Sequence, residues 1–215
     1  MASTRIALAG PICSGKSTVA QTLCDHCGFR RLSLAAPLKL LGECARHGAG
    51  EYARLLLDAL RPQAVGLGVM LDAYHRAVVE HEDELRSVGK PRAFLQDLGM
   101  RLRGVAPDIF IFALLERARY EGGSLVCDDL RFLDEARAFT AARWRLAWVR
   151  CEEDERRRRL AELYPNITPE QLNHQSETAL QYVDFDYTIT TGVPLEQLPE
   201  LVQPLLEAVS ARRMQ

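Results

Sequence analysis

The chain has 215 residues, of which 47% are hydrophobic and 26% charged, as expected for a globular protein with a sizeable core. A net charge of −2 and a pI of about 6.2 give no overall attraction to nucleic acid or to an acidic membrane. The sequence contains no signal-peptide-like stretch and no apolar run near the roughly 18 residues of a membrane span. Six scattered cysteines predict free thiols in a reducing cytoplasm.

Apolar runs and helical periodicity predict strands that alternate with helices along the chain. The run at 5–9, for example, is apolar and precedes a glycine, which is typical of a buried strand. Such alternation indicates an α/β fold with a parallel sheet covered by helices on both faces. The predicted strands lie at 5–9, 31–34, 124–129, 145–150 and 187–191, and the predicted helices at 14–27, 91–103, 109–120, 132–142, 151–163 and 195–209. The stretch 37–88 also has a helical pattern, which a turn at 61–62 and the glycines at 66 and 68 break.

Residues 10–17 match the pattern GxxxxGK[ST] in full, between a predicted strand and a predicted helix. The glycines let main-chain amides surround a phosphate, and Lys16 places a positive charge against the β and γ phosphates. Ser17 offers a hydroxyl to Mg²⁺, and the following helix directs its positive dipole end at the anion. A chance match is the alternative, but this context favours a site for ATP. The residues expected to contact the nucleotide are Gly10, Cys13, Ser14, Gly15, Lys16, Ser17 and Thr18.

Two carboxylates, Asp128 and Asp129, close the predicted strand at 124–129. Open α/β sheets bind their ligands at the carboxyl ends of the strands. A carboxylate at that edge can hold Mg²⁺ directly or through water. Capping of the next helix is the competing interpretation, because Asp is a common N-cap.

The predicted helix at 91–103 gathers polar residues on one face. Arg92, Gln96, Gly99 and Arg103 are spaced by four, three and four residues, so they lie along one side of the helix. Arginine offers two donors in a planar fork that matches a phosphate group. A solvated face opposite an apolar one is the alternative, and we favour binding of an acceptor's phosphate or base.

Four segments carry a resemblance to a known family, and the middle two fix four or more positions each. They are 33–39, then 92–103 with 107–108, then 129–136, and 174–177. Over about 5–200 the chain resembles the bacteriophage deoxynucleoside monophosphate kinases and their broader nucleoside monophosphate kinase relatives. Two positions depart from that pattern. Ala36 stands where an acidic residue is common, and Thr191 stands where Asn is common.

The resemblance implies a P-loop NTPase fold, a three-layer sandwich with a parallel sheet of about five strands, helices on both faces and a helical lid. We predict one domain over 1–215, with a helical acceptor-side insert at 43–90 and a lid region at 151–178. The residues at 174–177 are expected to form the hinge of the lid or to pack beside the base.

The arginines at 156–159 fall in the predicted lid region. A closing lid can bring arginine to the transferred phosphoryl group, neutralise developing charge and exclude water. A solvated helix whose arginines pair with neighbouring glutamates is the alternative. We favour a catalytic role for at least one of them, and the preferred candidates are Arg157, Arg158 and Arg159.

The activity implied by the resemblance is transfer of the γ-phosphoryl of Mg·ATP to a (deoxy)nucleoside monophosphate. No dedicated base is assigned, because a phosphate acceptor is already anionic near neutral pH. Asp129 is preferred to Asp128 as the partner of Ser17 on Mg²⁺. Glu135 is expected to brace Arg131. The expected catalytic residues are Lys16, Asp129, Arg131, Arg157, Arg158 and Arg159, and the expected substrate-side residues are Lys39, Arg92, Gln96, Arg103 and Asp128.

Two other functions compete with this one. A P-loop DNA kinase would phosphorylate a hydroxymethylpyrimidine in phage DNA, with Asp128 or Asp129 as base and with Arg101, Arg103 and the arginines at 156–159 along the DNA. A regulatory ATP-binding module would use the same arginines for protein partners. We expect a nucleotide substrate, no membrane partner, a monomer or a homodimer, and a cytoplasmic location, which is the host cytoplasm if a virus encodes the chain.

Overall fold

The computed structural model describes residues 3–172, 179–180 and 183–211. The chain divides into two compact units, an α/β unit of Met1–Ser33 with Arg117–Gln215 and a helical unit of Leu34–Glu116. The helical unit contains the predicted insert at 43–90 and extends beyond it on both sides. Within the described residues, no helix has the length and apolar character needed to cross a membrane.

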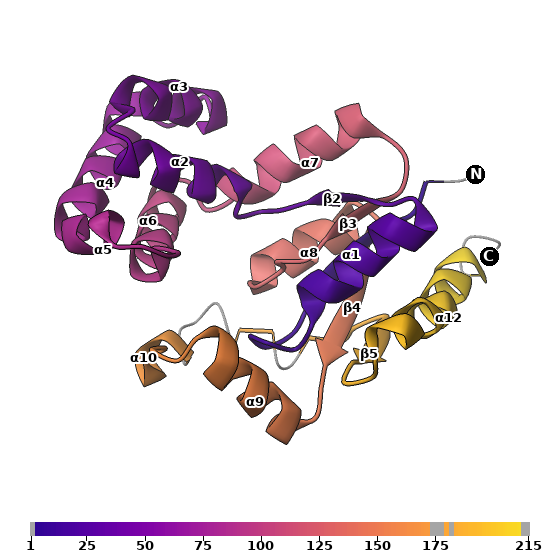
Figure 1. The fold of residues 1–215 in the computed structure, drawn as a ribbon. Helices are drawn as coiled ribbons and strands as arrows, with labels where there is room; N and C mark the ends of the chain where they lie inside the picture. Colours follow the sequence, from indigo (N-terminus) through magenta and orange to yellow (C-terminus); the bar gives the residue numbers. More distant parts are fainter. Residues whose placement is uncertain (1–2, 173–178, 181–182, 212–215) are drawn as a thin grey trace. The chain divides into compact units, whose positions relative to one another are not determined.

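The α/β unit is built on a five-stranded sheet in the order β2-β3-β1-β4-β5, and each neighbouring pair is parallel (Figure 1). β3 therefore lies between β1 and β2, so the segments that follow these three strands meet at one edge of the sheet. This arrangement confirms the predicted fold class. The strands are β1 (Arg5–Ala9), β2 (Arg30–Leu32), β3 (Leu125–Cys127), β4 (Arg145–Arg150) and β5 (Tyr187–Thr190).

The order of the strands places helices on both faces of the sheet. The chain crosses the sheet one way from β1 to β2 through α1, and the opposite way from β3 to β4 through α8. Right-handed connections in opposite directions put α1 and α8 on opposite faces. α12 packs beside α1 and against β5. The helices of this unit are α1 (Lys16–Cys27), α8 (Leu133–Ala141), α9 (Glu153–Leu163), α10 (Pro169–Leu172), the 3₁₀ helix η1 (Leu195–Gln197) and α12 (Leu198–Ala211).

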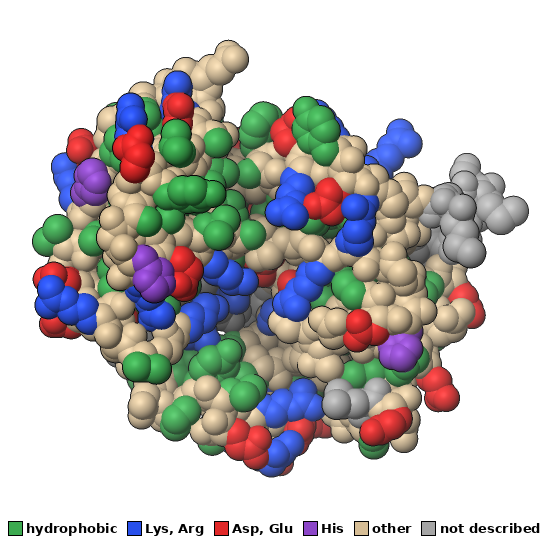
Figure 2. Space-filling model, turned by 45° about the horizontal axis from the view of Figure 1, so that its top comes forward, with side chains coloured by type: hydrophobic (Ala, Val, Ile, Leu, Met, Phe, Trp, Pro, Cys, Tyr) green, Lys and Arg blue, Asp and Glu red, His purple; other side chains and the backbone are tan. Residues whose placement is uncertain are grey.

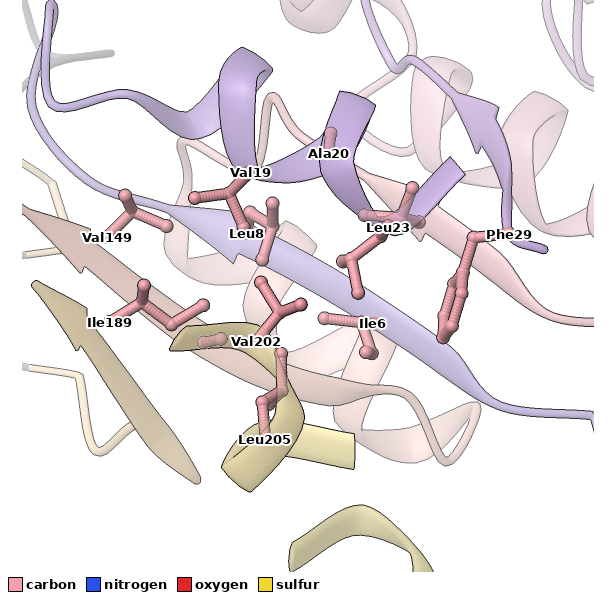
Figure 3. Packing of buried hydrophobic residues seen from close by; sticks show 12 residues of the cluster. Ile6, Leu8, Val19, Ala20, Leu23, Phe29, Val149, Ile189, Val202 and Leu205 are labelled. Carbon is pink, nitrogen blue, oxygen red and sulfur yellow. The ribbon is translucent and has the colours of Figure 1, made fainter. Parts of the chain in front are cut away.

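The main hydrophobic core of the α/β unit lies between the sheet and helices α1 and α12 (Figure 3). Ile6 and Leu8 alternate along β1 and are fully buried there. Val19 and Leu23, one helical turn apart on α1, pack against them and are also fully buried. Burial of each such side chain contributes roughly 1.5–3 kcal/mol. The segment between β1 and α1 is therefore anchored at both of its ends.

In the helical unit, α2 and α6 come close together because each offers a glycine at the contact. A Cβ on Gly42 would lie 3.4 Å from Leu95 Cδ2, and one on Gly99 would lie 3.2 Å from Leu38 Cδ1. Gly99 is thus buried against α2 and does not belong to a solvated face. The helices are α2 (Ala36–Arg46), α3 (Gly50–Leu60), α4 (Leu67–Glu80), α5 (Glu82–Arg86) and α6 (Arg92–Val105), and α7 (Ile109–Glu121) runs from this unit into the α/β unit.

Candidate active site

The phosphate loop at 10–17 joins β1 to α1, and its two glycines adopt conformations that other residues rarely adopt. Gly10 has a φ of +146° and Gly15 a φ of +95°. A Cβ on Gly10 would lie only 2.1 Å from the carbonyl oxygen of Val149, so a side chain cannot be accommodated there. Because α1 begins at Lys16, the positive end of its dipole lies at the loop.

Lys16 and Ser14 differ in the hydrogen bonds that their side chains make within the loop. Lys16 Nζ donates hydrogen bonds to the carbonyl oxygens of Gly10, at 2.6 Å, and Pro11, at 2.7 Å. Ser14 is fully buried, and its hydroxyl has no hydrogen-bond partner in the described part of the chain. A buried polar group without a partner is unfavourable, so the loop is short of one acceptor or donor.

Thr191 and Cys151, which follow β5 and β4, support the loop, and neither residue was predicted in this role from the sequence. Thr191 is 6% exposed, and its hydroxyl donates to the carbonyl oxygen of Ser14 at 2.7 Å. The same side chain would be 3.1 Å from a Cβ on Gly15, so it packs directly against the loop. The thiol of Cys151 donates to the carbonyl oxygen of Cys13 at 3.7 Å. Polar residues at the carboxyl ends of predicted strands were the available signal.

Asp128, directly after β3, is held from two sides. The Ser17 hydroxyl donates to its Oδ2 at 2.8 Å. Arg31 Nε donates to its Oδ1 at 2.9 Å, and Arg31 Nη2 also contacts Oδ2. The Asp128 side chain is 5% exposed and that of Arg31 38%. The hydrogen bond to Asp128 raises the pKa of Arg31, which keeps the guanidinium charged beside a buried carboxylate.

Strand alternation explains why Asp128 reaches Ser17. Val126 packs in the core shared with α1, and Asp128, two residues later, points to the same face of the sheet. Arg31 is opposite Val126 in the parallel pairing of β2 with β3, so it lies on that face too. From the sequence we predicted Asp129 as the partner of Ser17, but the hydrogen bond from Ser17 goes to Asp128 instead. A metal-binding role for either carboxylate stays a prediction.

Asp129 has the opposite strand parity and different partners. The Cys127 thiol donates to its Oδ1 at 3.2 Å, and the Ser33 hydroxyl donates to its Oδ2 at 2.6 Å. Burial raises the pKa of Cys127 well above its usual value, so the thiol stays protonated and can donate. The two adjacent carboxylates therefore have different partners. Asp128 contacts Ser17 of the phosphate loop, whereas Asp129 contacts Ser33, the residue after β2.

Glu135 fixes the loop that follows Asp129. Its Oε2 accepts hydrogen bonds from the main-chain N–H groups of Arg131, at 2.8 Å, and Phe132, at 3.0 Å. Glu135 is 1% exposed, and these bonds satisfy its buried carboxylate. It braces Arg131 through the main chain, and the catalytic role expected for the Arg131 side chain stays a prediction.

Four of the residues expected on the substrate side lie in the helical unit, whereas the fifth, Asp128, lies in the α/β unit and contacts Ser17. Arg92, Gln96 and Arg103 are half-buried along α6, and Lys39 is exposed on α2. The Arg103 guanidinium lies 4.8 Å from the centroid of the Phe110 ring, in a cation–π arrangement that limits its motion. The predicted substrate-side residues are thus divided between the helical unit and the α/β unit.

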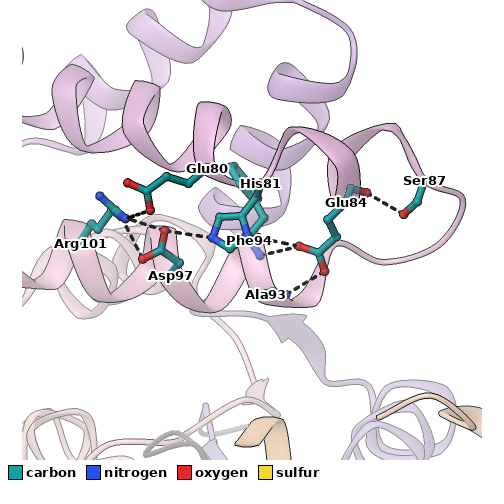
Figure 4. A network of polar contacts seen from close by, with 8 residues as sticks. All are labelled: Glu80, His81, Glu84, Ser87, Ala93, Phe94, Asp97 and Arg101. Carbon is teal, nitrogen blue, oxygen red and sulfur yellow. Dashed lines mark hydrogen bonds and ion pairs between the residues drawn. The ribbon is translucent and has the colours of Figure 1, made fainter. Parts of the chain in front are cut away.

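Arg101 is engaged within the helical unit (Figure 4). Its Nε donates to Asp97 at 2.9 and 2.8 Å, and its Nη2 pairs with Glu80. His81 contacts the same Asp97 carboxylate at 3.2 Å. The guanidinium has carboxylate partners on both α4 and α6, so it ties these helices together. This role differs from the DNA-contacting one in the DNA-kinase alternative.

All four arginines of α9 pair with glutamates of the same helix. The pairs are Arg156–Glu153, Arg157–Glu153, Arg158–Glu155, Arg158–Glu162 and Arg159–Glu155. Arg157 and Arg158 are 70% and 58% exposed, whereas Arg156 and Arg159 are 22% and 24% exposed. Basic and acidic side chains are also interspersed on the molecular face in Figure 2. The expected hinge residues at 174–177 lie outside the described residues.

The donor set beside the loop fits a nucleotide phosphate and its Mg²⁺. Mg²⁺ is usually held by one or two carboxylates together with substrate phosphates and water, and Ser17 and Asp128 supply a hydroxyl and a carboxylate in contact. Nowhere in 3–172, 179–180 and 183–211 do three or more His, Cys, Asp or Glu gather as a metal site. The glycine turn and the buried Ser14 hydroxyl fit a phosphate oxygen.

No family model matches this chain, and no curated protein matches it either. Solved structures similar to it include TT1252 from Thermus thermophilus, with 24% identity over 99% of this chain and 98% of that chain and a TM-score of 0.49. An unliganded sugar kinase from Janibacter sp. HTCC2649 has 14% identity over 97% of both chains and a TM-score of 0.49. The APS kinase of Mycobacterium tuberculosis, in complex with AMPPNP and APS, has 16% identity over 98% of this chain and 99% of that chain, with a TM-score of 0.44. At TM-scores below 0.5, these likenesses assign no activity to this chain.

Proposed function

We propose that this protein is a phosphotransferase that uses Mg·ATP as its phosphoryl donor. The observation that carries the proposal is the hydrogen bond from Ser17 to the buried Asp128, at 2.8 Å. It lies beside a phosphate loop whose carbonyl oxygens accept hydrogen bonds from Lys16. Loops of this kind bind the β and γ phosphates through main-chain amides and the lysine. A neighbouring hydroxyl and carboxylate are the groups that such sites use for Mg²⁺.

Each residue of the loop region has a role in this proposal. Lys16 leaves the carbonyl oxygens of the loop and neutralises phosphate charge, while Thr191 keeps the main chain of the loop in place. Ser17 and Asp128 hold Mg²⁺, which supplies charge neutralisation at the phosphate oxygens when it is bound. The bond from the γ-phosphorus to the ADP oxygen breaks as a bond to the acceptor oxygen forms. No covalent enzyme intermediate is needed, because positioning and electrostatics carry most of this catalysis.

Among the arginines of α9, we propose Arg156 and Arg159 as the pair on the phosphate-loop side. Burial raises the pKa of the Cys151 thiol, and the positive charges of Arg159 and Arg156 oppose that rise, so both arginines lie near Cys151. Cys151 in turn contacts the loop at Cys13. Arg156 was not among the preferred candidates from the sequence, and the more exposed arginines of α9 are less suited to a water-excluding role.

The acceptor we propose is a (deoxy)nucleoside monophosphate. Half-buried Arg92 and Arg103 on α6 supply forked donors of the kind that bind phosphate, and Arg103 is steadied by Phe110. Gln96 lies between them along the helix and offers an amide to a base. An anionic acceptor phosphate needs no base from the protein.

An alcohol is the second candidate acceptor, as in the DNA-kinase alternative. The contact that favours it is the 2.6 Å hydrogen bond from the Ser33 hydroxyl to Asp129. A carboxylate that accepts this hydrogen bond could accept one from a substrate hydroxyl, whose proton would pass to Asp129 as the phosphoryl group arrives.

The test is an ATP-consumption assay with Mg²⁺ and a panel of ribo- and deoxynucleoside monophosphates. Duplex DNA with and without hydroxymethylpyrimidine is assayed beside them, with Lys16→Ala as the control. We expect turnover on a free monophosphate that is lost in Lys16→Ala. Transfer to modified DNA alone would replace the nucleotide acceptor with the alcohol, and silence on every acceptor would contradict phosphotransfer.

Arg103→Gln, assayed on the preferred monophosphate, separates acceptor binding from ATP binding. Loss of a charge-assisted hydrogen bond costs about 1.5–3 kcal/mol, so we expect the acceptor KM to rise about tenfold or more. The KM for ATP should stay unchanged, because Arg103 is not among the residues that we assign to ATP. An unchanged acceptor KM would remove Arg103 from the acceptor site.

A further inference from the structure

Arg31 was not predicted as a site residue, yet it contacts the carboxylate that we assign to Mg²⁺. We propose that Arg31 is a positioning residue that orients Asp128 toward Ser17 and offsets part of the attraction of this carboxylate for Mg²⁺. The inference rests on the proposed function, because it concerns the same site. It adds a residue from β2 to a site otherwise formed by the phosphate loop and the end of β3.

The geometry of the pair fixes the carboxylate in one orientation. Two nitrogens of Arg31 contact the two oxygens of Asp128, so rotation of the carboxylate would break both contacts. Oδ2 is the oxygen that also accepts from Ser17, at 2.8 Å. Since β3 lies between β1 and β2, Asp128 is reached from the phosphate loop on one side and from Arg31 on the other.

Arg30, the neighbour of Arg31 on β2, has different partners and is suitable for comparison. Its guanidinium contacts the main-chain carbonyl oxygens of Glu121 and Gly122, and the side chain is 52% exposed. Exposed ion pairs and contacts of this type contribute little. Arg31 differs because its partner Asp128 is 5% exposed and touches a residue of the phosphate loop. Arg30→Gln is therefore a matched control.

The charge of Arg31 and its fork have separate consequences. A positive charge next to Asp128 weakens the attraction of the carboxylate for a cation, so its removal should lower the Mg²⁺ concentration for half-maximal nucleotide binding, by about three- to tenfold. Lysine keeps the charge but cannot form the two-point contact. Loss of the fork lets the carboxylate rotate, and kcat should fall about tenfold or more in both Arg31→Gln and Arg31→Lys.

The experiment titrates binding of a fluorescent ATP analogue with Mg²⁺, and repeats it in EDTA, for wild type, Arg31→Gln, Arg31→Lys and Arg30→Gln. Thermal unfolding and kcat are measured on the same samples. We expect the Mg²⁺ midpoint to fall in Arg31→Gln, to stay near wild type in Arg31→Lys, and binding in EDTA to stay unchanged. Arg30→Gln should resemble wild type in both Mg²⁺ midpoint and kcat. In an Asp128→Asn background, Arg31→Gln should have no further effect on the midpoint.

Several results would overturn the inference. One is a Mg²⁺ midpoint and a kcat in Arg31→Gln that both equal those of wild type. Another is a Mg²⁺ midpoint that rises in Arg31→Gln. The third is a change in Arg31→Gln that is confined to the unfolding temperature, which would indicate a purely structural ion pair. If Arg31→Gln does not fold, Arg31→Lys decides through its kcat. Failure of the proposed function looks different, since wild type would then bind no ATP analogue, or Lys16→Ala would bind it equally well.

Discussion

Thr191 holds the phosphate loop through a contact between residues 177 positions apart in the chain. Its hydroxyl satisfies the buried carbonyl of Ser14, and it is placed by β5, whose last residue also pairs with the end of β4. The main chain of Thr191 continues that pairing, because its N–H donates to the carbonyl oxygen of Arg150 at 2.7 Å. The loop is therefore supported by the sheet beneath it as well as by its own glycines.

Thr191→Val keeps the shape of the side chain and removes this hydrogen bond. The Ser14 carbonyl is left without its side-chain donor, so we expect the free energy of unfolding to fall by about 1–3 kcal/mol. The KM for ATP should rise as well. Thr188→Val is the control, because Thr188 is exposed on β5, the strand that precedes Thr191, and its effect should stay within about 0.5 kcal/mol. Equal effects in urea denaturation would show that the contact with Ser14 is not stabilising.

At the scale of elements, the N-terminus of α6 is capped by another helix. Its own N-cap position, Pro91, provides no side-chain hydrogen bond. Glu84 of α5 accepts from the N–H groups of Ala93, at 2.9 Å, and Phe94, at 2.7 Å (Figure 4). These are donors that a helix leaves unsatisfied in its first turn. The negative charge also lies at the positive end of the helix dipole.

Glu84→Ala removes this cap, and we expect a loss of about 1–2 kcal/mol in the free energy of unfolding, measured by urea denaturation. Glu82→Ala provides the comparison. Glu82 is in the same short helix and pairs with Arg86, with both side chains more than half exposed. Such a pair contributes about 0–1 kcal/mol, so the control should cost clearly less. A Glu84→Ala variant as stable as the control would argue against the cap.

α9 has no buried side chain and is held by ion pairs along its own surface. The hydrogen bond from Arg156 lowers the pKa of Glu153 to about 2, and the one from Arg158 lowers the pKa of Glu155 to about 2. Because the pKa of each carboxylate in the folded protein lies below its ordinary value of 4.5, the ion pairs stabilise the helix fully at pH values above 4.5. Their contribution is lost as the pH falls from about 4.5 to about 2.

We therefore expect both carboxylates to remain ionised at pH 4 in an NMR titration at low salt. Because the pairs are exposed, added salt should screen them and move both midpoints upward. Titration of Glu153 and Glu155 near 4.5 at low salt would show that the pairs do not persist in solution.

For the whole molecule, the sequence was sufficient to predict the five strands of the sheet and the contiguous phosphate loop. The loop residues are neighbours in the chain, and strand and helix flank them, so local pattern was enough. Arg31 was missed because its partner Asp128 is 97 residues away, and strand order decides that they meet. The preference for Asp129 came from the family pattern, whereas the parity of Asp128 with the apolar Val126 pointed to the other carboxylate.

In the function that we propose, Asp128, and not Asp129, completes the Mg·ATP site. The most direct measurement is calorimetric titration with ATP, in Mg²⁺ and in EDTA, of wild type, Asp128→Asn and Asp129→Asn. We predict that Asp128→Asn loses the gain in affinity that Mg²⁺ gives to wild type, while Asp129→Asn keeps it. Loss of the Mg²⁺ effect in Asp129→Asn, with the effect retained in Asp128→Asn, would assign the Mg²⁺ to Asp129 and contradict the proposed site.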